Sequence, residues 1–277
     1  MKSVDANGVS FAYLEQGTGP LVLLVHGFPD TPHTWDAAMP AIAAAGYRAV
    51  APFTRGYAPT TIPADGAYDT DTLAADVLAL IEALGEARAI VVGHDWGASA
   101  AYAAAALAPE RVPLLVTVGL PHPSAIRPTP RLAWTMRHFV TLRRARAADR
   151  MRANDFALVD ELVQRWSPGW RVPPDETAAV KAVFRDPAAL EAALGYYRAL
   201  GLRLPASLGK PITVPTVAFA GEHDHVSPRT YERARHCFAA SYEVLQVPGG
   251  HFMHREHPEL FATELVRVLH DHAERVR

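Results

Sequence analysis

Residues 89–98 read Ala-Ile-Val-Val-Gly-His-Asp-Trp-Gly-Ala, and this stretch decides the fold. It predicts an apolar strand, a turn of small residues, and an alanine-rich helix over about Ser99–Leu107, which is the context of a nucleophile elbow. Gly93 and Gly97 flank the turn, where a Cβ atom would crowd the neighbouring strand or helix. The residue at the apex, Asp95, should therefore project outward at the C-terminal edge of a sheet.

An aspartate at the apex indicates a particular chemistry. A carboxylate is already ionised at neutral pH and needs no general base to act as a nucleophile. Its attack on a carbonyl would give an anhydride, whereas attack on a saturated carbon gives an ordinary ester that activated water can cleave. Asp95 therefore indicates displacement at an sp3 carbon that carries a leaving group, as in an epoxide or an alkyl halide.

Composition limits the class of protein. The chain has 277 residues, 49% of them hydrophobic, which predicts one large domain or a core domain with an inserted subdomain. Its formal net charge of -2 gives no reason to expect nucleic acid or an anionic membrane as a partner. Cys237 is the single cysteine, so we expect no disulfide and no cysteine-based metal site.

Targeting signals are not evident in the sequence. No apolar run reaches the length of a membrane span, and residues 1–16 do not resemble a signal peptide. We expect a cytoplasmic monomer or homodimer that acts on a small apolar or amphipathic molecule and uses neither cofactor nor metal.

Strands and helices alternate along most of the chain. The predicted strands are Val9–Glu15, Leu21–Val25, Tyr47–Ala51, the elbow strand, Leu114–Gly119, Pro215–Ala220 and Tyr242–Val247. The predicted helices are Thr34–Ala45, Asp71–Leu84, Ser99–Leu107 and Pro258–Arg275. This order predicts the α/β class, with a mostly parallel central sheet flanked by helices.

The alternation stops at about Pro123. Residues 124–208 contain proline-punctuated helical segments, predicted over Arg131–Met151, Phe156–Trp166, Glu176–Phe184 and Pro187–Leu200. We interpret residues 124–208 as a helical cap, or lid, inserted into a core domain of residues 1–123 and 209–277.

Two late loops supply partners for Asp95. Asp224 follows the strand at 215–220, and His251 follows the strand at 242–247, so both should reach the same sheet edge as the elbow. The order nucleophile, acid, histidine is that of an α/β-hydrolase. His251 would activate water, and Asp224, with Glu222 as a weaker alternative, would orient the imidazole. The backbone N–H groups of Phe28 and Trp96 are the candidate oxyanion hole.

Several motifs together carry a resemblance that covers nearly the whole chain. The sequence resembles α/β-hydrolases of the epoxide hydrolase and haloalkane dehalogenase branch at residues 26–29 (His-Gly-Phe-Pro), 55–57 (Arg-Gly-Tyr), 93–97 (Gly-His-Asp-Trp-Gly) and 249–252 (Gly-Gly-His-Phe). Dehalogenases of this branch commonly carry asparagine where this chain has Phe28. Fluoroacetate-type dehalogenases carry arginines after the nucleophile, where this chain has tryptophan and alanines. Epoxide hydrolases are therefore the nearest resemblance.

The resemblance also assigns residues in the cap. Epoxide hydrolases use cap tyrosines to protonate the opening oxygen, and residues 195–198, Gly-Tyr-Tyr-Arg, place Tyr197 in that role. The other tyrosine should follow a tryptophan early in the cap, where this chain has Trp134-Thr135, so His138 is a candidate substitute. The expected substrate-binding residues are Trp35, Trp134, Thr135, His138 and Tyr196.

Two other functions remain open. One is a haloalkane or haloacid dehalogenase that uses the same nucleophile, and assays for diol and for free halide would distinguish the two. The other is a non-catalytic ligand-binding homologue, which the complete set of Asp95, Asp224 and His251 disfavours.

The cap is rich in arginine. Eight lie between residues 127 and 152, namely Arg127, Arg131, Arg137, Arg143, Arg144, Arg146, Arg150 and Arg152. They form either a solvated outer face or a surface that attracts an acidic substrate or partner.

Overall fold

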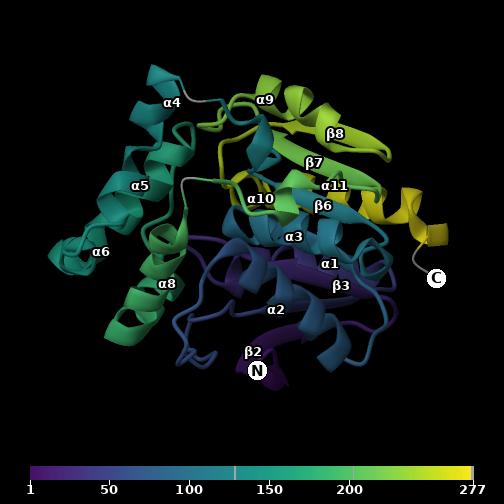
Figure 1. The fold of residues 1–277 in the computed structure, drawn as a ribbon, viewed down its shortest axis with the longest axis horizontal. Helices are drawn as coiled ribbons and strands as arrows, with labels where there is room; N and C mark the ends of the chain where they lie inside the picture. The colour runs from purple at the N-terminus through teal and green to yellow at the C-terminus, as the bar shows by residue number, and fades with distance from the viewer. Residues whose placement is uncertain (128, 202, 276–277) are drawn as a thin grey trace.

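The computed structural model describes residues 1–127, 129–201 and 203–275. Within these residues an eight-stranded sheet runs in the order β1-β2-β4-β3-β5-β6-β7-β8 (Figure 1). The first two pairings are antiparallel and all others are parallel. The strands are β1 Lys2–Ala6, β2 Val9–Gln16, β3 Leu21–Val25, β4 Arg48–Pro52, β5 Ile90–His94, β6 Leu115–Val118, β7 Thr216–Gly221 and β8 Tyr242–Val247. The predicted fold class is confirmed.

Helices cover both faces of the sheet. Because side chains alternate along a strand, Leu21 and Leu23 of β3 pack in one hydrophobic cluster, while Val22 and Leu24 pack in another. The first cluster includes side chains of α2 (Thr70–Ala83) and α3 (Trp96–Leu107), and the second includes those of α1 (Ala38–Ala44) and α11 (Pro258–Asp271). All five residues of β3 are buried, as expected for a parallel strand between two helical layers.

A helical segment lies between β6 and β7. Its helices, called the cap helices below, are α4 Pro130–Thr135, α5 Arg137–Leu142, α6 Ala147–Trp166, α7 Ala178–Phe184 and α8 Pro187–Ala199. Figure 1 shows α4, α5, α6 and α8 together at one side of the sheet. The division of the chain at 123/124 and 208/209 stays a prediction. None of the helices in the described ranges is long and apolar enough to cross a membrane.

Several predicted boundaries differ from the structure. The helix predicted over 131–151 is divided among α4, α5 and the start of α6, and α6 itself leaves helical geometry at residues 153–156. Of the helix predicted over 34–45, residues 34 and 35 belong to a 3-10 turn, Pro32–Trp35, and the α-helix α1 begins only at Ala38. The sequence analysis did not predict β1, the short helices α9 (Pro228–Arg233) and α10 (Met253–Glu256), or the separate 3-10 turn Ala273–Arg275 after α11.

Close backbone contacts hold the elbow between β5 and α3. A Cβ atom on Gly93 would overlap the carbonyl group of Gly97, and a Cβ atom on Gly97 would overlap the carbonyl oxygen of Val25 in β3. The helix can therefore approach the sheet this closely only with glycine at both positions. Asp95 between them has φ 53° and ψ -116°, a conformation that costs a non-glycine residue on the order of 1–3 kcal/mol.

Replacing Gly97 with alanine tests this packing. We expect Gly97→Ala to lower the free energy of unfolding by about 3 kcal/mol, because the clash is with the backbone of β3 and no rotamer change relieves it. Gly209→Ala is the matched control, since a Cβ atom there meets nothing within 4 Å. The control should change stability by less than about 1 kcal/mol in urea unfolding. Equal effects of the two substitutions would contradict the packing argument.

Candidate active site

Asp95 occupies the apex of the elbow. Its Oδ1 accepts a hydrogen bond of 2.9 Å from the backbone N–H of Phe28, which lies in the loop after β3. Gly27 in that loop has no room for a Cβ atom, because the Asp95 side chain would lie 2.5 Å from it. The Asp95 side chain is 18% exposed, so a small molecule can reach it.

His251 lies between two carboxylates. Its Nε2 is 3.5 Å from Oδ2 of Asp95, and its Nδ1 is 3.3 Å from Oδ2 of Asp224. Asp224 follows β7 and His251 follows β8, so the parallel sheet brings all three side chains to one edge. Both His251 and Asp224 are buried. The structure thus brings together the nucleophile, base and acid predicted from the sequence, while Glu222 is exposed.

The three groups stabilise one another's charged forms. Burial alone would lower the pKa of His251, but the charge and hydrogen bond of Asp224, followed by those of Asp95, raise this pKa to about 10. Burial opposes ionisation of Asp95 as well, yet the hydrogen bond and charge of His251 hold the pKa of Asp95 below its ordinary value. The pKa of Asp224 is lowered by His225 and His251 against the effect of burial. At neutral pH the arrangement is an imidazolium between two carboxylates.

The cap holds the loop that carries His251. The backbone N–H of His251 donates to the carbonyl oxygen of Trp166 over 2.9 Å, and that of Phe252 donates to Oγ of Ser167 over 3.1 Å. A Cβ atom on Gly250 would lie 2.6 Å from the Trp166 oxygen. This role of Trp166 and Ser167 was not predicted from the sequence, because it depends on where the end of α6 packs.

His225 is a further residue that the sequence analysis missed. Its Nδ1 lies 2.6 Å from Oδ1 of Asp224, the oxygen that does not face His251. Its ring stacks on Trp166 at 5.6 Å, with 28° between the planes. The adjacency of Asp224 and His225 in one loop is the sequence feature from which this contact could have been predicted.

Backbone donors surround the other side of Asp95. The N–H of Phe28 already points at Oδ1, and Trp96 is the first residue of α3, where the N–H has no acceptor within the helix. These are the two groups predicted as the oxyanion hole, and their role stays a prediction.

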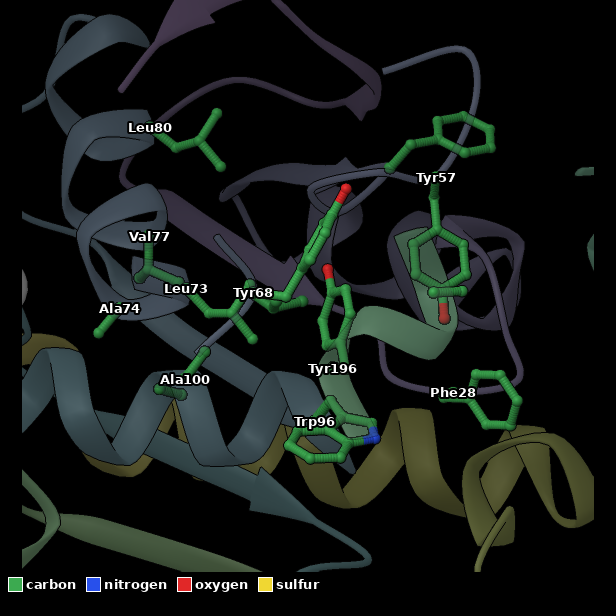
Figure 2. Close-up of a cluster of buried hydrophobic side chains, with 14 of the residues drawn as sticks. Phe28, Tyr57, Tyr68, Leu73, Ala74, Val77, Leu80, Trp96, Ala100 and Tyr196 are labelled. Carbon is green, nitrogen blue, oxygen red and sulfur yellow. The ribbon is translucent and has the colours of Figure 1, made fainter. Parts of the chain in front are cut away.

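The neighbouring cap tyrosines have different surroundings. Tyr197 is buried, and its ring packs edge-on against Phe28 at 5.0 Å and Trp96 at 5.2 Å. Burial and the charge of Asp95 raise the pKa of Tyr197 well above its ordinary value, so its phenol stays protonated. The hydroxyl of Tyr196 instead donates to the carbonyl oxygen of Arg55 over 2.7 Å. Figure 2 shows Tyr196 pointing into the hydrophobic cluster near Trp96 and Tyr68.

The other residues predicted to bind substrate lie in different places. Trp35 is fully buried in the cluster of α1 and α11, where it packs against His254 at 5.0 Å. Trp134 is 70% exposed, with the Arg137 guanidinium 4.5 Å from its ring. Neither tryptophan lies where a substrate-binding residue was expected. The reason is that tertiary packing decides what an indole ring contacts, and the hydrophobic periodicity of the sequence does not record it.

Thr135 and His138 lie closer to the catalytic groups. Thr135 lines a cavity of about 340 Å³ together with Asp224 and His225. His138 is buried, with its ring 6.0 Å from that of Tyr197. Burial lowers the pKa of His138 to about 3, so it is neutral. Its Nδ1 lies 3.3 Å from the Thr135 carbonyl oxygen, an arrangement that leaves Nε2 as an acceptor.

A second cavity, of about 330 Å³, reaches Asp95. Apolar side chains from the elbow, the cap helices and the loop after α8 form most of its lining, including Trp96, Met136, Phe139, Leu200, Leu204 and Leu208. A cavity of this size and character suits a small, largely apolar molecule.

Two groups of described residues have ligand atoms close enough to hold a metal ion. They are Asp30, His94 and His254, and Asp224, His225 and His251. In the first group Asp30 is already paired with Arg255 at 3.0 Å, and in the second Asp224 is paired with both histidines. Each carboxylate therefore has a cationic or hydrogen-bonding partner within the protein.

Comparison with known proteins identifies the family. Residues 20–258 match the family described as the alpha/beta hydrolase fold, and the chain belongs to that family. It is an enzyme of this family and is similar to the epoxide hydrolases.

Individual relatives agree with this placement. The chain is 29% identical to epoxide hydrolase A of Mycobacterium tuberculosis, over 96% of each chain. It is 28% identical to the AB hydrolase superfamily protein YfhM of Bacillus subtilis, over 93% of each. A Caballeronia sordidicola epoxide hydrolase is 45% identical over 119 residues, which are 43% of this chain and 36% of that protein.

Solved structures share the fold. A Klebsiella pneumoniae crystal structure superposes with a TM-score of 0.84, at 27% identity over 96% of each chain. The structure of Bacillus megaterium epoxide hydrolase superposes with a TM-score of 0.86, at 24% identity, over 97% of this chain and 100% of the other.

The raised pKa of His251 predicts how stability depends on pH. A folded-state pKa above the unfolded value of 6.5 stabilises the fold fully below pH 6.5, and this contribution is lost as pH rises through about 10. We expect His251→Gln to remove a pH-dependent term on the order of a few kcal/mol over this interval. Urea unfolding at several pH values measures it, with His223→Gln, which removes an exposed histidine, as control. A profile of His251→Gln parallel to the wild-type profile would contradict the pairing.

Proposed function

We propose that this enzyme hydrolyses epoxides to vicinal diols through a covalent ester on Asp95. The observation that carries the proposal is the position of the Asp95 carboxylate, whose Oδ1 accepts from Phe28 and whose Oδ2 faces His251. The substrate class also has the support of the relatives that are named epoxide hydrolases.

Ring opening is the first step. Oδ2 of Asp95 forms a bond to an epoxide carbon, the carbon–oxygen bond of the ring breaks, and its electron pair goes to the ring oxygen. The phenol of Tyr197, kept neutral by burial, donates a hydrogen bond to that oxygen as negative charge develops on it. The Phe28 N–H holds Oδ1 and so directs Oδ2 toward the substrate.

The proton needed by the new alkoxide comes from His251. In the free enzyme two carboxylates hold this residue as an imidazolium. Ester formation removes the charge of Asp95, and with it one of the causes of the raised pKa of His251. The imidazolium then loses its proton to the alkoxide, with Tyr197 as the hydrogen-bonding intermediary. His251 becomes a neutral base at the moment when a base is required.

Ester hydrolysis is the second step. His251, oriented by Asp224, takes a proton from water, and the hydroxide attacks Cγ of Asp95. The N–H groups of Phe28 and Trp96 stabilise the resulting oxyanion. Collapse of this intermediate breaks the ester carbon–oxygen bond, and the departing alkoxide takes the proton of the new Asp95 carboxyl group and leaves as the diol. It also restores the Asp95 carboxylate and the His251 imidazolium, so that protons balance over the cycle.

The surroundings of Phe28 and Tyr197 favour an oxygen leaving group over a halide. A halide leaves without a proton, whereas an epoxide oxygen needs one, and Tyr197 is a proton donor beside the nucleophile. Phe28 packs against Phe184 at 5.8 Å and has no side-chain N–H with which to bind a halide.

Trapping the intermediate tests the mechanism. We expect His251→Gln, incubated with a reactive epoxide, to gain the mass of the intact epoxide, with the adduct mapped to Asp95 by peptide mass spectrometry. The first step survives in this variant because the nucleophile is unchanged and solvent water can protonate the alkoxide in place of His251, and the second fails because the base is gone. Asp95→Asn is the control and should gain no mass. Release of free halide from alkyl halides by the wild type, without diol from any epoxide, would contradict the proposed substrate.

The two adjacent tyrosines provide a matched pair. We expect Tyr197→Phe to slow ring opening by about 100-fold, because the departing oxygen loses its hydrogen-bond donor. Tyr196→Phe should leave this rate within a few-fold of wild type, because its hydroxyl bonds to the backbone of Arg55. Single-turnover measurement of adduct formation in the His251→Gln background isolates the first step. Equal losses from both substitutions would remove Tyr197 from the mechanism.

A further inference from the structure

Positive charge is concentrated in one part of the cap. Residues 127–152 contain eight arginines and one acidic residue, Asp149, which is a net formal charge of +7. The whole chain carries -2, so the remaining residues carry -9. The small net charge that argued against an anionic partner therefore hides a strong separation of charge.

Several of these arginines are exposed and have few acidic partners. Figure 1 shows α5 and α6 at the edge of the molecule away from the sheet. The arginines at the junction of these helices, Arg143, Arg144 and Arg146, and Arg150 in the first turn of α6 are exposed. Among the described residues of 127–152, Arg152 forms an ion pair with Asp149, with a nitrogen–oxygen distance of 3.8 Å.

Two arginines of this segment act electrostatically on Arg165 in α6. Burial lowers the pKa of Arg165 in α6, and the nearby charges of Arg137 and Arg150 lower it further. Nε of Arg165 is buried without a hydrogen-bond partner among the described residues. An anion bound near these side chains would relieve the repulsion.

Apolar side chains are exposed on the same helices. Trp134 in α4 is 70% exposed and Val140 in α5 is 60% exposed, the two largest exposures among the large hydrophobic side chains of the described cap. The Arg137 guanidinium lies over the Trp134 ring. Tryptophan beside arginine is the combination favoured at the boundary between lipid headgroups and acyl chains.

We propose that this surface, formed by Trp134, Arg137, Val140, Arg143, Arg144, Arg146 and Arg150 and called the basic cap surface, docks on anionic phospholipid bilayers. Anionic headgroups neutralise the guanidinium groups, and Trp134 and Val140 enter the interfacial layer. A second copy of this chain is disfavoured as the occupant, because the same surface would bring two sets of like charges together. Nucleic acid would neutralise the arginines but leave the two apolar side chains without an apolar partner.

The location of the surface is relevant to substrate access, although the docking itself does not depend on the reaction at Asp95. Met136 and Phe139, from the same segment as Trp134 and Val140, line the apolar cavity that reaches Asp95. An enzyme docked through this surface would hold the wall of that cavity close to molecules dissolved in the bilayer.

Vesicle binding tests the proposal. At low ionic strength the full-length protein should pellet with vesicles of phosphatidylcholine mixed with phosphatidylglycerol, and should remain in solution with vesicles of phosphatidylcholine alone. The double variant Arg143→Glu/Arg144→Glu should bind the mixed vesicles at least about tenfold more weakly, since each basic residue near an anionic surface contributes to binding. Lys210→Glu/Arg229→Glu reverses two exposed charges of the core and should bind like wild type.

Fluorescence distinguishes a bilayer from another polyanion. Mixed vesicles should shift the tryptophan emission of the wild type to shorter wavelength, and Trp134→Ser should abolish this shift. Leu107→Ser, at a core side chain that is 42% exposed, is the control and should preserve it. The proposal is overturned if nothing pellets, if the control charge reversal weakens binding equally, or if duplex DNA competes fully and no emission shift accompanies vesicle binding.

Discussion

The close approach of α3 to the end of β3 is the constraint on which the site depends. Glycines at 27, 93 and 97 remove the side chains that would keep these segments apart, and the resulting turn forces Asp95 into a backbone conformation that few residues adopt. The same contact places the Phe28 N–H on one carboxylate oxygen and leaves the other free toward His251. Packing energy from two helical layers maintains a strained backbone, and the strain presents a charged oxygen at the sheet edge.

The cap helices are attached at two places to the loops around Asp95 and His251. The end of α6 holds the His251 loop through the carbonyl group of Trp166 and the hydroxyl of Ser167. On the other side, Tyr196 of α8 bonds to the Arg55 backbone, which anchors the helix that carries Tyr197 above the elbow. A shift of the cap would therefore move Tyr197 and the His251 loop together. Phe139 and Leu204 line the cavity that reaches Asp95.

The parts predicted correctly from the sequence share one property, which is that short-range pattern encodes them. The elbow, the buried parallel strands and the loops that carry Asp224 and His251 each follow from a strand, a turn and their order along the chain. Trp35 and Trp134 could not be placed in this way. Trp35 is fully buried and Trp134 is exposed to solvent, and tertiary packing decides the difference. Ser167 escaped notice because its partner, the Phe252 N–H, is fixed only when loop and cap fold together. His225 could have been found from its adjacency to Asp224.

The distribution of charge, like the packing of the tryptophans, cannot be read from a total over the sequence. The overall net charge is a sum over the chain, and sums do not record position. Residues 127–152 carry a formal charge of +7 and the remaining residues -9, and Met136 and Phe139 of this segment line the cavity that reaches Asp95. Burial keeps His138 and Tyr197 neutral at the inner side of the same cap. The described cap thus combines exposed arginines at residues 143–150 with the buried, neutral side chains of His138 and Tyr197.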